Sequence, residues 1–197
     1  MPKPRRPVLL VHGILGQRAL YWNVFRHRLE HDGFVVEEVT FPGYLLGDLR
    51  RAAEVLQEEV ETMARTGHPE VDLVCHSAGG LVARHYVQQM GGDAHVRHVV
   101  MLGTPHRGTY FAYAMGIPVG LAAQARPGST VLASLDAAPW PKQVRATNFW
   151  SPVDGIVIPG ERSFWQHADN VKVWTHHWAY LVSRRVYDQV KQALLRR

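Results

Sequence analysis

The sequence predicts a three-layer α/β fold built on a minimal parallel sheet of about six strands. Short apolar runs alternate with amphipathic segments of about 12 or more residues, and no internal repeat or low-complexity linker interrupts them. Connections of that length allow right-handed crossovers between parallel strands. Reactive groups in such sheets gather beyond the carboxyl ends of the strands, so the loops that follow the strands are where we expect the chemistry.

The expected elements follow from apolar periodicity and from the residues that interrupt it. The expected strands are 7–11, 34–39, 71–76, 98–102, 143–149 and 171–174. The expected helices are 19–31, a segment whose apolar face runs from 49 to 63, a segment from the turn at residue 77 to about 90, and 180–195. Glycine or proline ends the first three helices, at Gly33, Gly67, Pro69, Gly91 and Gly92.

Length and composition set the class of protein. We interpret residues 1–197 as one α/β domain with a cap or insert at about 108–142. With 46% hydrophobic and 20% charged residues, the composition is that of an ordinary globular protein, which excludes disordered and fibrous classes. A single cysteine, Cys75, excludes an internal disulfide framework. No run approaches the roughly 18 apolar residues that a membrane span requires.

The charge balance bears on partners and location. A net charge of +5 invites a nucleic-acid interpretation, but the basic residues are spread along the chain without an interleaved aromatic–basic motif, so we expect no nucleic-acid partner. The basic stretch 1–7 is followed by an apolar run that is too short for a signal peptide. We therefore expect a cytoplasmic protein, or a secreted one if a preceding segment was trimmed. No oligomeric state is predicted.

One stretch, 71–82, organises the expected chemistry. It begins as an apolar strand, passes through Ser77 and continues as a helix, which is the pattern of a sharp turn that presents a hydroxyl group. Such a turn strains the backbone and requires small residues on both sides. Gly79 meets this requirement, whereas Cys75 stands where the usual G-x-S-x-G pattern has glycine. Ser77 is therefore the candidate nucleophile.

A serine nucleophile needs a base, and the base needs a group that orients it. Asp154 follows the fifth expected strand, and the His176-His177 pair follows the sixth. The order Ser…Asp…His agrees with one of the three common serine-triad orders. Asp136 and Asp169 compete with Asp154, but neither is expected at the carboxyl end of a strand. The residues alone leave the choice between His176 and His177 open.

Stabilising the oxyanion requires two backbone N–H donors. The amide of Ala78 lies at the start of the expected helix after Ser77, where the helix dipole favours an anion. The loop after the first strand contains His12-Gly13-Ile14, and the amide of Ile14 is our second candidate.

Several segments carry a family resemblance: PVLLVHGILG, CHSAGGLVARHY, VVMLGTPHRG, SPVDGIV and the histidine after NVKVW. Together they resemble the small bacterial lipases and esterases of the α/β-hydrolase superfamily, and most of all the minimal Bacillus lipase A type. The resemblance covers nearly the whole chain except about 108–142. It implies carboxylic-ester hydrolysis through an acyl-enzyme, with Ser77 as nucleophile, His177 as base, Asp154 as its orienter, and Ile14 and Ala78 as oxyanion donors.

The resemblance also implies an ester or lipid substrate, transient contact with a lipid surface, and no cofactor. Other acyl-transfer enzymes on this scaffold (acyltransferase, thioesterase or amidase) are the alternative, and product analysis with competing acceptors would separate them. A non-catalytic binding protein of the same fold is the second alternative, and its usual mark is a broken triad.

The remaining histidines and tryptophans receive structural interpretations. We expect His12 to shape its loop and His76 to pack beside the turn. The spacing of four others does not form a recognised metal-ligand set, so we expect solvated or hydrogen-bonded surface side chains at His95, His98, His106 and His167. Trp174 and Trp178 flank the histidine pair, where they line an acyl pocket or pack in the core.

The segment 110–125, YFAYAMGIPVGLAAQA, is nearly free of polar groups and is interrupted by Pro118. Two interpretations stay open. It forms a pair of short helices that complete the core, or it forms a cap over Ser77 that supplies an apolar acyl-binding surface.

A histidine base must be neutral to accept a proton, so esterase activity should rise with pH between about 6 and 8. The measurement is the pH dependence of kcat/KM on a short p-nitrophenyl ester, with circular dichroism to confirm that the chain is folded at each pH. A flat profile across this range would contradict a histidine base.

Overall fold

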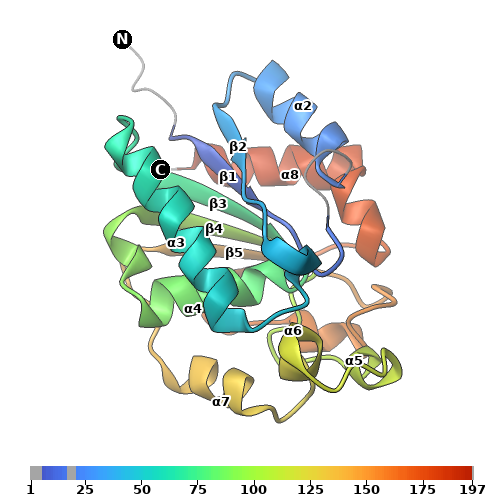
Figure 1. Cartoon of the computed structure of the whole chain (residues 1–197). Coiled ribbons are helices and arrows are strands. Elements are labelled where there is room, and N and C mark those ends of the chain that lie inside the picture. Colours follow the sequence, from blue (N-terminus) through green and yellow to red (C-terminus); the bar gives the residue numbers. More distant parts are fainter. Residues whose placement is uncertain (1–5, 17–20, 197) are drawn as a thin grey trace.

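The computed structural model describes residues 6–16 and 21–196. Within them, six parallel strands form one sheet in the order β2-β1-β3-β4-β5-β6 (Figure 1). The strands are β1 (Val8–Val11), β2 (Val36–Glu38), β3 (Val71–His76), β4 (Val96–Leu102), β5 (Arg145–Trp150) and β6 (Asp169–Lys172). The predicted fold class and strand number are confirmed.

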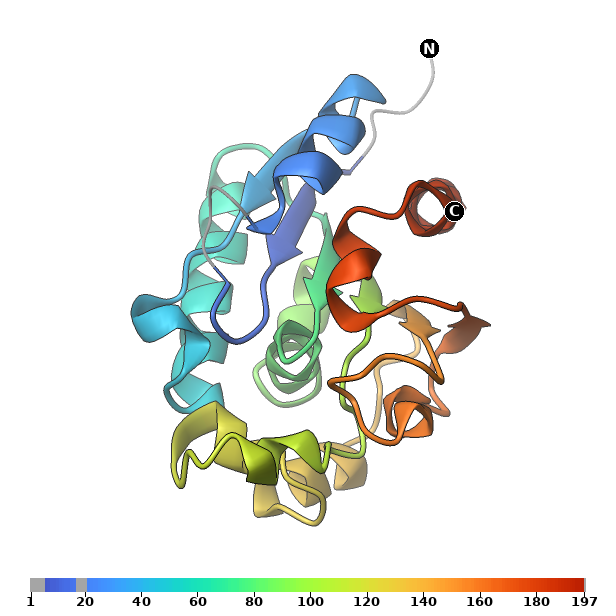
Figure 2. The ribbon, with the colours of Figure 1, turned by 90° about the vertical axis from the view of Figure 1, so that its right-hand side faces the viewer.

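Long helices cover both faces of the sheet (Figures 1 and 2). Helices α3 (Leu49–Arg65) and α4 (Gly79–Gln89) pack on one face, and α2 (Asn23–His31) and α8 (Arg184–Leu195) pack on the other. The shorter helices are α5 (Phe111–Ala114), α6 (Gly120–Gln124) and α7 (Thr130–Ala137), together with the 3-10 helices η1 (Pro42–Leu45), η2 (Gly92–Ala94), η3 (Gly160–Ser163) and η4 (His177–Leu181).

Alternation along the inner strands divides the core between the two faces. In β1, Leu9 and Val11 pack with α3 and α4, whereas Val8 and Leu10 pack with α2 and α8. Every residue of β3 is buried, as expected for a central strand covered by helices on both sides. This burial fixes the carboxyl end of β3, and with it the position of the residue that follows.

Polar caps set where the two longest helices begin. The Asp48 carboxylate accepts a hydrogen bond from the Arg50 amide at 2.8 Å and starts α3. Ser183 caps α8 in the same way through the Val186 amide at 3.3 Å. The predicted helix 180–195 is therefore wrong at its start, because the segment before Ser183 forms the 3-10 helix η4 instead.

The sixth strand also differs from its prediction. β6 begins at Asp169 and ends at Lys172, so the expected range 171–174 was two residues late and Asp169 lies in the strand instead of before it. Strand β6 is at the edge of the sheet, where Asp169 is exposed while its backbone pairs with Thr147. A polar strand residue is tolerated there because only one side of an edge strand is paired.

Part of one predicted helix lies outside the described residues. The expected segment 19–31 is helical over α2, and residues 19 and 20 are not described. Trp22, Phe25 and Leu29 are buried as their helical spacing predicted. None of the helices in the described residues is long and apolar enough to cross a membrane.

Two of the four histidines expected at the surface are buried instead. The His98 ring bonds the Thr147 hydroxyl at 2.9 Å, while the His106 ring stacks on Trp165 at 4.9 Å beside the buried Arg84. Arg84 pairs with Asp136 at 3.0 Å. Asp136 belongs to α7, so it lies in a helix and not at the carboxyl end of a strand. The sequence signal was ambiguous because histidine is compatible with either environment.

Burial makes the stability of this fold sensitive to acid. Desolvation lowers the pKa of His98 to about 3, with smaller contributions from Arg145 and Arg6. The folded chain keeps His98 neutral, whereas the unfolded chain takes up a proton below about pH 6.5. The His98 contribution to stability is thus complete above pH 6.5 and declines as the pH falls toward 3.

When the pH is lowered from 7 to 5, the free energy of unfolding of His98→Gln should fall by about 2 kcal/mol less than that of the wild type. The reason is that glutamine takes up no proton in the unfolded state. Urea unfolding at both pH values measures the difference. His27→Gln is the matched control, because the His27 side chain is exposed. Equal pH dependence in His98→Gln and the wild type would contradict the assignment.

Candidate active site at the carboxyl ends of the strands

Ser77 occupies a sharp turn between β3 and α4. Its φ of +55° is left-handed, a conformation that a serine rarely adopts. The turn is held because the Ser77 amide donates to the Leu102 carbonyl at 2.9 Å and the Ser77 carbonyl accepts from the Gly80 amide at 3.1 Å. The strained backbone predicted for this stretch is therefore present, and it occurs at the candidate nucleophile.

Close backbone contacts explain the small residues around the turn. A Cβ atom on Gly79 would lie 2.6 Å from the carbonyl oxygens of Val11 and His12, and one on Gly13 would lie 2.7 Å from Cβ of Ser77. Cys75 has no such constraint, because its side chain packs in the apolar core beneath α3 and α4. Burial also raises the pKa of the Cys75 thiol.

Asp154 and His177 meet through both side chains and backbone. Nδ1 of His177 lies 2.8 Å from Oδ1 and 3.0 Å from Oδ2 of Asp154, and the His177 amide donates to the Asp154 carbonyl at 2.8 Å. The Asp154 side chain is 0% exposed and that of His177 is 3% exposed. His176 is exposed, so the geometry selects His177 as the partner of Asp154.

Backbone donors hold the carboxylate of Asp154 in place. Its Oδ1 also accepts from the amides of Ile156 at 3.0 Å and Val157 at 2.7 Å. These bonds fix the direction of the carboxylate. With Nδ1 of His177 engaged by Asp154, Nε2 is the ring nitrogen that remains for a reacting group.

Sequence reasoning missed Ser151, which ties the two loops together. Its buried hydroxyl oxygen accepts from the Val153 amide at 3.2 Å and from the Thr175 amide at 3.1 Å. The loop after β5 is thereby joined to the loop after β6. The sequence could have indicated only the local bond, because a serine two residues before Val153 often bonds that amide. The bond to the Thr175 amide joins residues that are distant in sequence.

The five predicted site residues converge on one cavity. Ser77, Ala78, Ile14 and His177 line a cavity of about 110 Å³, and Asp154 lies directly behind His177. Other lining side chains come from the loop after β1 and from the insert, among them Leu15, Phe111, Ala112, Met115 and Ala122. Within the described residues, no hydrogen bond joins the Ser77 hydroxyl to His177; such bonds are often long without substrate.

Two residues that line this cavity, Ile14 and Ala78, have backbone amides without a hydrogen-bond partner among the described residues. The loop that carries Ile14 is held by Leu15, whose φ is +62° and whose amide donates to the Tyr44 carbonyl at 2.9 Å. His12 also shapes this loop, as predicted, since its Nδ1 bonds the Gly13 carbonyl at 2.8 Å.

The segment 110–125 contributes to the core and also lines the cavity. It contains the two short helices α5 and α6, which lie beside the carboxyl ends of the strands (Figure 1). Leu121 and Ala125 join the core, while Phe111, Met115 and Ala122 line the cavity with Ser77. The insert is thus part of the core and part of the site.

The two tryptophans beside His177 are not core residues. Trp174 is 71% exposed, with the Lys172 ammonium 5.2 Å from its ring centroid. Trp178 is 52% exposed and lines the cavity. The core interpretation is therefore wrong for both, because the loop after β6 turns their rings outward from the sheet.

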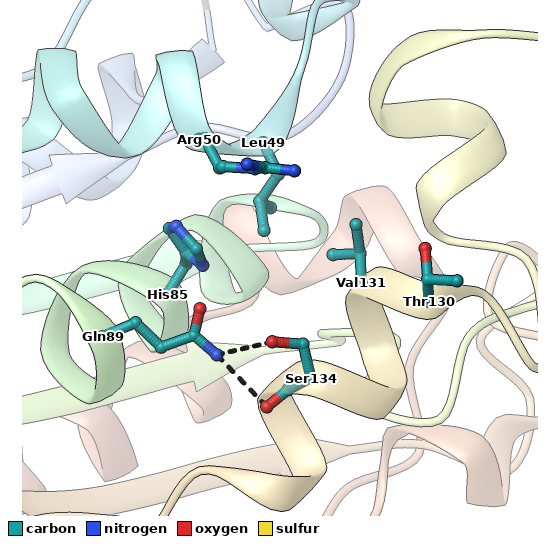
Figure 3. Close-up of a pocket in the computed structure, with 7 residues that line it drawn as sticks. All are labelled: Leu49, Arg50, His85, Gln89, Thr130, Val131 and Ser134. Carbon is teal, nitrogen blue, oxygen red and sulfur yellow. Dashed lines mark hydrogen bonds between the residues drawn. The ribbon is translucent and has the colours of Figure 1, made fainter.

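A larger hollow lies elsewhere, and its chemistry is different. This hollow has a volume of about 310 Å³ and is bounded by residues of α3, α4 and α7, which are drawn in Figure 3. Gln89 spans part of it and donates to the backbone and hydroxyl oxygens of Ser134. None of the predicted site residues lines it, so cavity size alone does not locate the site.

No group of three or more histidine, cysteine, aspartate or glutamate side chains in the described residues is arranged to hold a metal ion.

Fold and site together define the class of protein. A parallel sheet with helices on both faces, a strained serine turn after β3, and an Asp–His pair from the loops after β5 and β6 are the features of the α/β-hydrolase fold. The chain belongs to the family described as a domain of unknown function, DUF7379, whose model matches residues 1–117. Ser77, Ile14 and Ala78 lie inside the matched residues, and Asp154 and His177 lie outside them.

Relatives and solved structures agree with this class. The chain is 35% identical over 115 residues to proteins named triacylglycerol lipase from Pseudarthrobacter phenanthrenivorans and Burkholderia plantarii. These matches cover 55% of this chain but only 35% and 32% of those proteins, so the chain matches about a third of their length. The mature lipase BlEst2 of Bacillus licheniformis superposes with a TM-score of 0.84 at 16% identity, over 97% of this chain and 92% of that one.

Proposed function

We propose that this protein is a serine carboxylic-ester hydrolase that works through a Ser77–His177–Asp154 triad and an acyl-enzyme. One observation carries the proposal: a histidine fixed by a buried carboxylate lines the same cavity as a serine in a strained turn and two residues whose amides have no partner within the described part of the chain. The names of the curated relatives, triacylglycerol lipases, support the same class of reaction.

The proposed reaction follows from the roles of these groups. Nε2 of His177 takes the proton of the Ser77 hydroxyl as its oxygen attacks the acyl carbon. The amides of Ile14 and Ala78 donate to the oxyanion of the tetrahedral intermediate. His177 then protonates the departing alcohol, and water repeats the two steps on the acyl-enzyme. Asp154 orients the ring and stabilises the imidazolium that forms.

The cavity supports an apolar acyl group. Phe111, Ala112, Met115 and Ala122 enclose the space next to Ser77, and these side chains offer no charge to a substrate. A cavity of about 110 Å³ accommodates a short acyl chain, and a longer chain would extend past α5 and α6. We therefore propose esters of fatty acids as the substrate class, with lipid surfaces as one source of them.

The test of the function is a panel of p-nitrophenyl esters with acyl chains from acetate to palmitate, hydrolysed by the wild type and by Ser77→Ala. We expect hydrolysis by the wild type and a loss of at least about 1000-fold in kcat in Ser77→Ala. A fluorophosphonate probe should label the wild type at Ser77 and leave the variant unlabelled. An inactive, unlabelled wild type would remove the proposed function, and a fully active Ser77→Ala would remove the nucleophile.

The test of the acyl site is Ala122→Leu, which adds bulk to a buried position that lines the cavity. We expect kcat/KM to fall at least 10-fold for octanoate and longer esters and less than threefold for the acetate ester, because only longer chains need this space. Ala133→Leu, at an exposed position on α7, is the matched control. Equal losses on short and long esters would place the acyl chain elsewhere.

A further inference from the structure

We propose that Tyr21 and His76 are positioning residues, which connect the loop carrying the oxyanion donor Ile14 to the base His177. The inference rests on the proposed function, in which these two parts must act together. Three hydrogen bonds form the connection. The Gly13 amide donates to the Tyr21 hydroxyl oxygen at 3.2 Å, that hydroxyl lies 2.5 Å from Nδ1 of His76, and Nε2 of His76 lies 2.9 Å from the His177 carbonyl oxygen.

The direction of each bond follows from the groups at the two ends. The Gly13 amide can only donate and the His177 carbonyl can only accept. Nε2 of His76 must therefore carry a proton, and in a neutral ring Nδ1 must accept the hydroxyl proton of Tyr21. Each donor in these three hydrogen bonds then has an acceptor. The arrangement specifies one tautomer of His76.

The three hydrogen bonds involve residues that belong to, or directly precede, the groups that act in the proposed reaction. Gly13 precedes Ile14, His76 precedes Ser77, and the His177 carbonyl belongs to the residue whose ring transfers the proton. Gly13 and His177 each have a second hydrogen bond through the other polar group of their backbone. The Gly13 carbonyl bonds the His12 ring, and the His177 amide donates to the Asp154 carbonyl. Tyr21 and His76 are the described side chains that join the two sides directly.

His76 is enclosed, so its orientation is fixed. The side chain is fully buried, with the rings of Tyr21, Trp178 and His177 at 5.5, 5.9 and 4.6 Å between centroids. Burial lowers the pKa of His76 well below its usual range, and the neighbouring His177 lowers it further. A neutral His76 leaves the His177 imidazolium unopposed during catalysis, whereas a cation 4.6 Å away would repel it.

Removing the Tyr21 hydroxyl leaves the Gly13 amide and Nδ1 of His76 without their partner. The His76 ring stays enclosed and keeps its bond to the His177 carbonyl, but the Gly13 amide no longer ties the loop that carries Ile14 to this ring. The position of the Ile14 amide relative to His177 is then less well defined. This cost falls on the transition state, where the two must be aligned, more than on substrate binding. We expect Tyr21→Phe to lower kcat about 10- to 100-fold with KM changed less than threefold.

His76 variants separate the two halves of the connection. Glutamine can place an amide N–H near the position of Nε2 and keep the bond to the His177 carbonyl, whereas leucine keeps neither bond. We expect His76→Gln to retain at least 10-fold more kcat than His76→Leu. Tyr187→Phe is the matched control, because that hydroxyl donates to Asp32 at 2.5 Å on the α2–α8 side of the molecule. It should lower stability and leave kcat unchanged.

The experiment is steady-state kinetics on the acetate ester for these four variants, each corrected for its folded fraction by circular dichroism. The connection is supported if kcat falls in Tyr21→Phe while the KM of that variant changes less than threefold, and if kcat is unchanged in Tyr187→Phe. Full kcat in Tyr21→Phe, or a loss that only follows the folded fraction, overturns it.

A second readout does not depend on turnover. Nitrogen chemical shifts of the histidine rings in the wild type should report His76 as the Nε2–H tautomer, and Tyr21→Phe should change that signal. If Ser77→Ala is as active as the wild type, the proposed function fails, while the tautomer still decides whether the connection exists. A different His76 tautomer in the wild type overturns the connection itself.

Discussion

The structure depends on how closely the turn at Ser77 approaches the end of β1. The turn is held left-handed because Leu102 at the end of β4 accepts a hydrogen bond from its amide, and because Gly79 faces the backbone at the end of β1 while Gly13 faces Ser77 itself. A side chain at either position would push the strand ends apart and separate Ser77 from Ile14. The strain at one residue is thus sustained by the packing of a fully buried central strand.

The second half of the site is assembled from loops and depends on hydrogen bonds more than on packing. Asp154 accepts from His177 and from two backbone amides, and Ser151 joins the loop after β5 to the loop after β6. Strand β6 is short and lies at the edge of the sheet, so it supplies little packing to hold the loop after it. The polar network around Asp154 replaces that support.

Local patterns predicted most elements well and failed where tertiary surroundings decide. Helix α3 was clear because its apolar face runs from Leu49 to Met63 and because Gly67 follows its end. The start of α8 was misplaced because Ser183 acts as a cap only once the chain before it has turned into η4. His98 and His106 were placed at the surface because their burial depends on partners that are distant in sequence, Thr147 for the one and Trp165 for the other.

By itself, the sequence determined the parallel α/β fold, the turn at Ser77, and the order of serine, aspartate and histidine along the chain, because each of these follows from local periodicity or from residues next to a strand end. The family resemblance favoured His177 over His176, but only the tertiary structure brought His177 to Asp154, put the insert on both the core and the cavity, and brought Tyr21 to His76 across 55 positions of sequence. The physical reason is the same in each case: strand order and register decide which loop ends meet, and these are set by packing between distant segments.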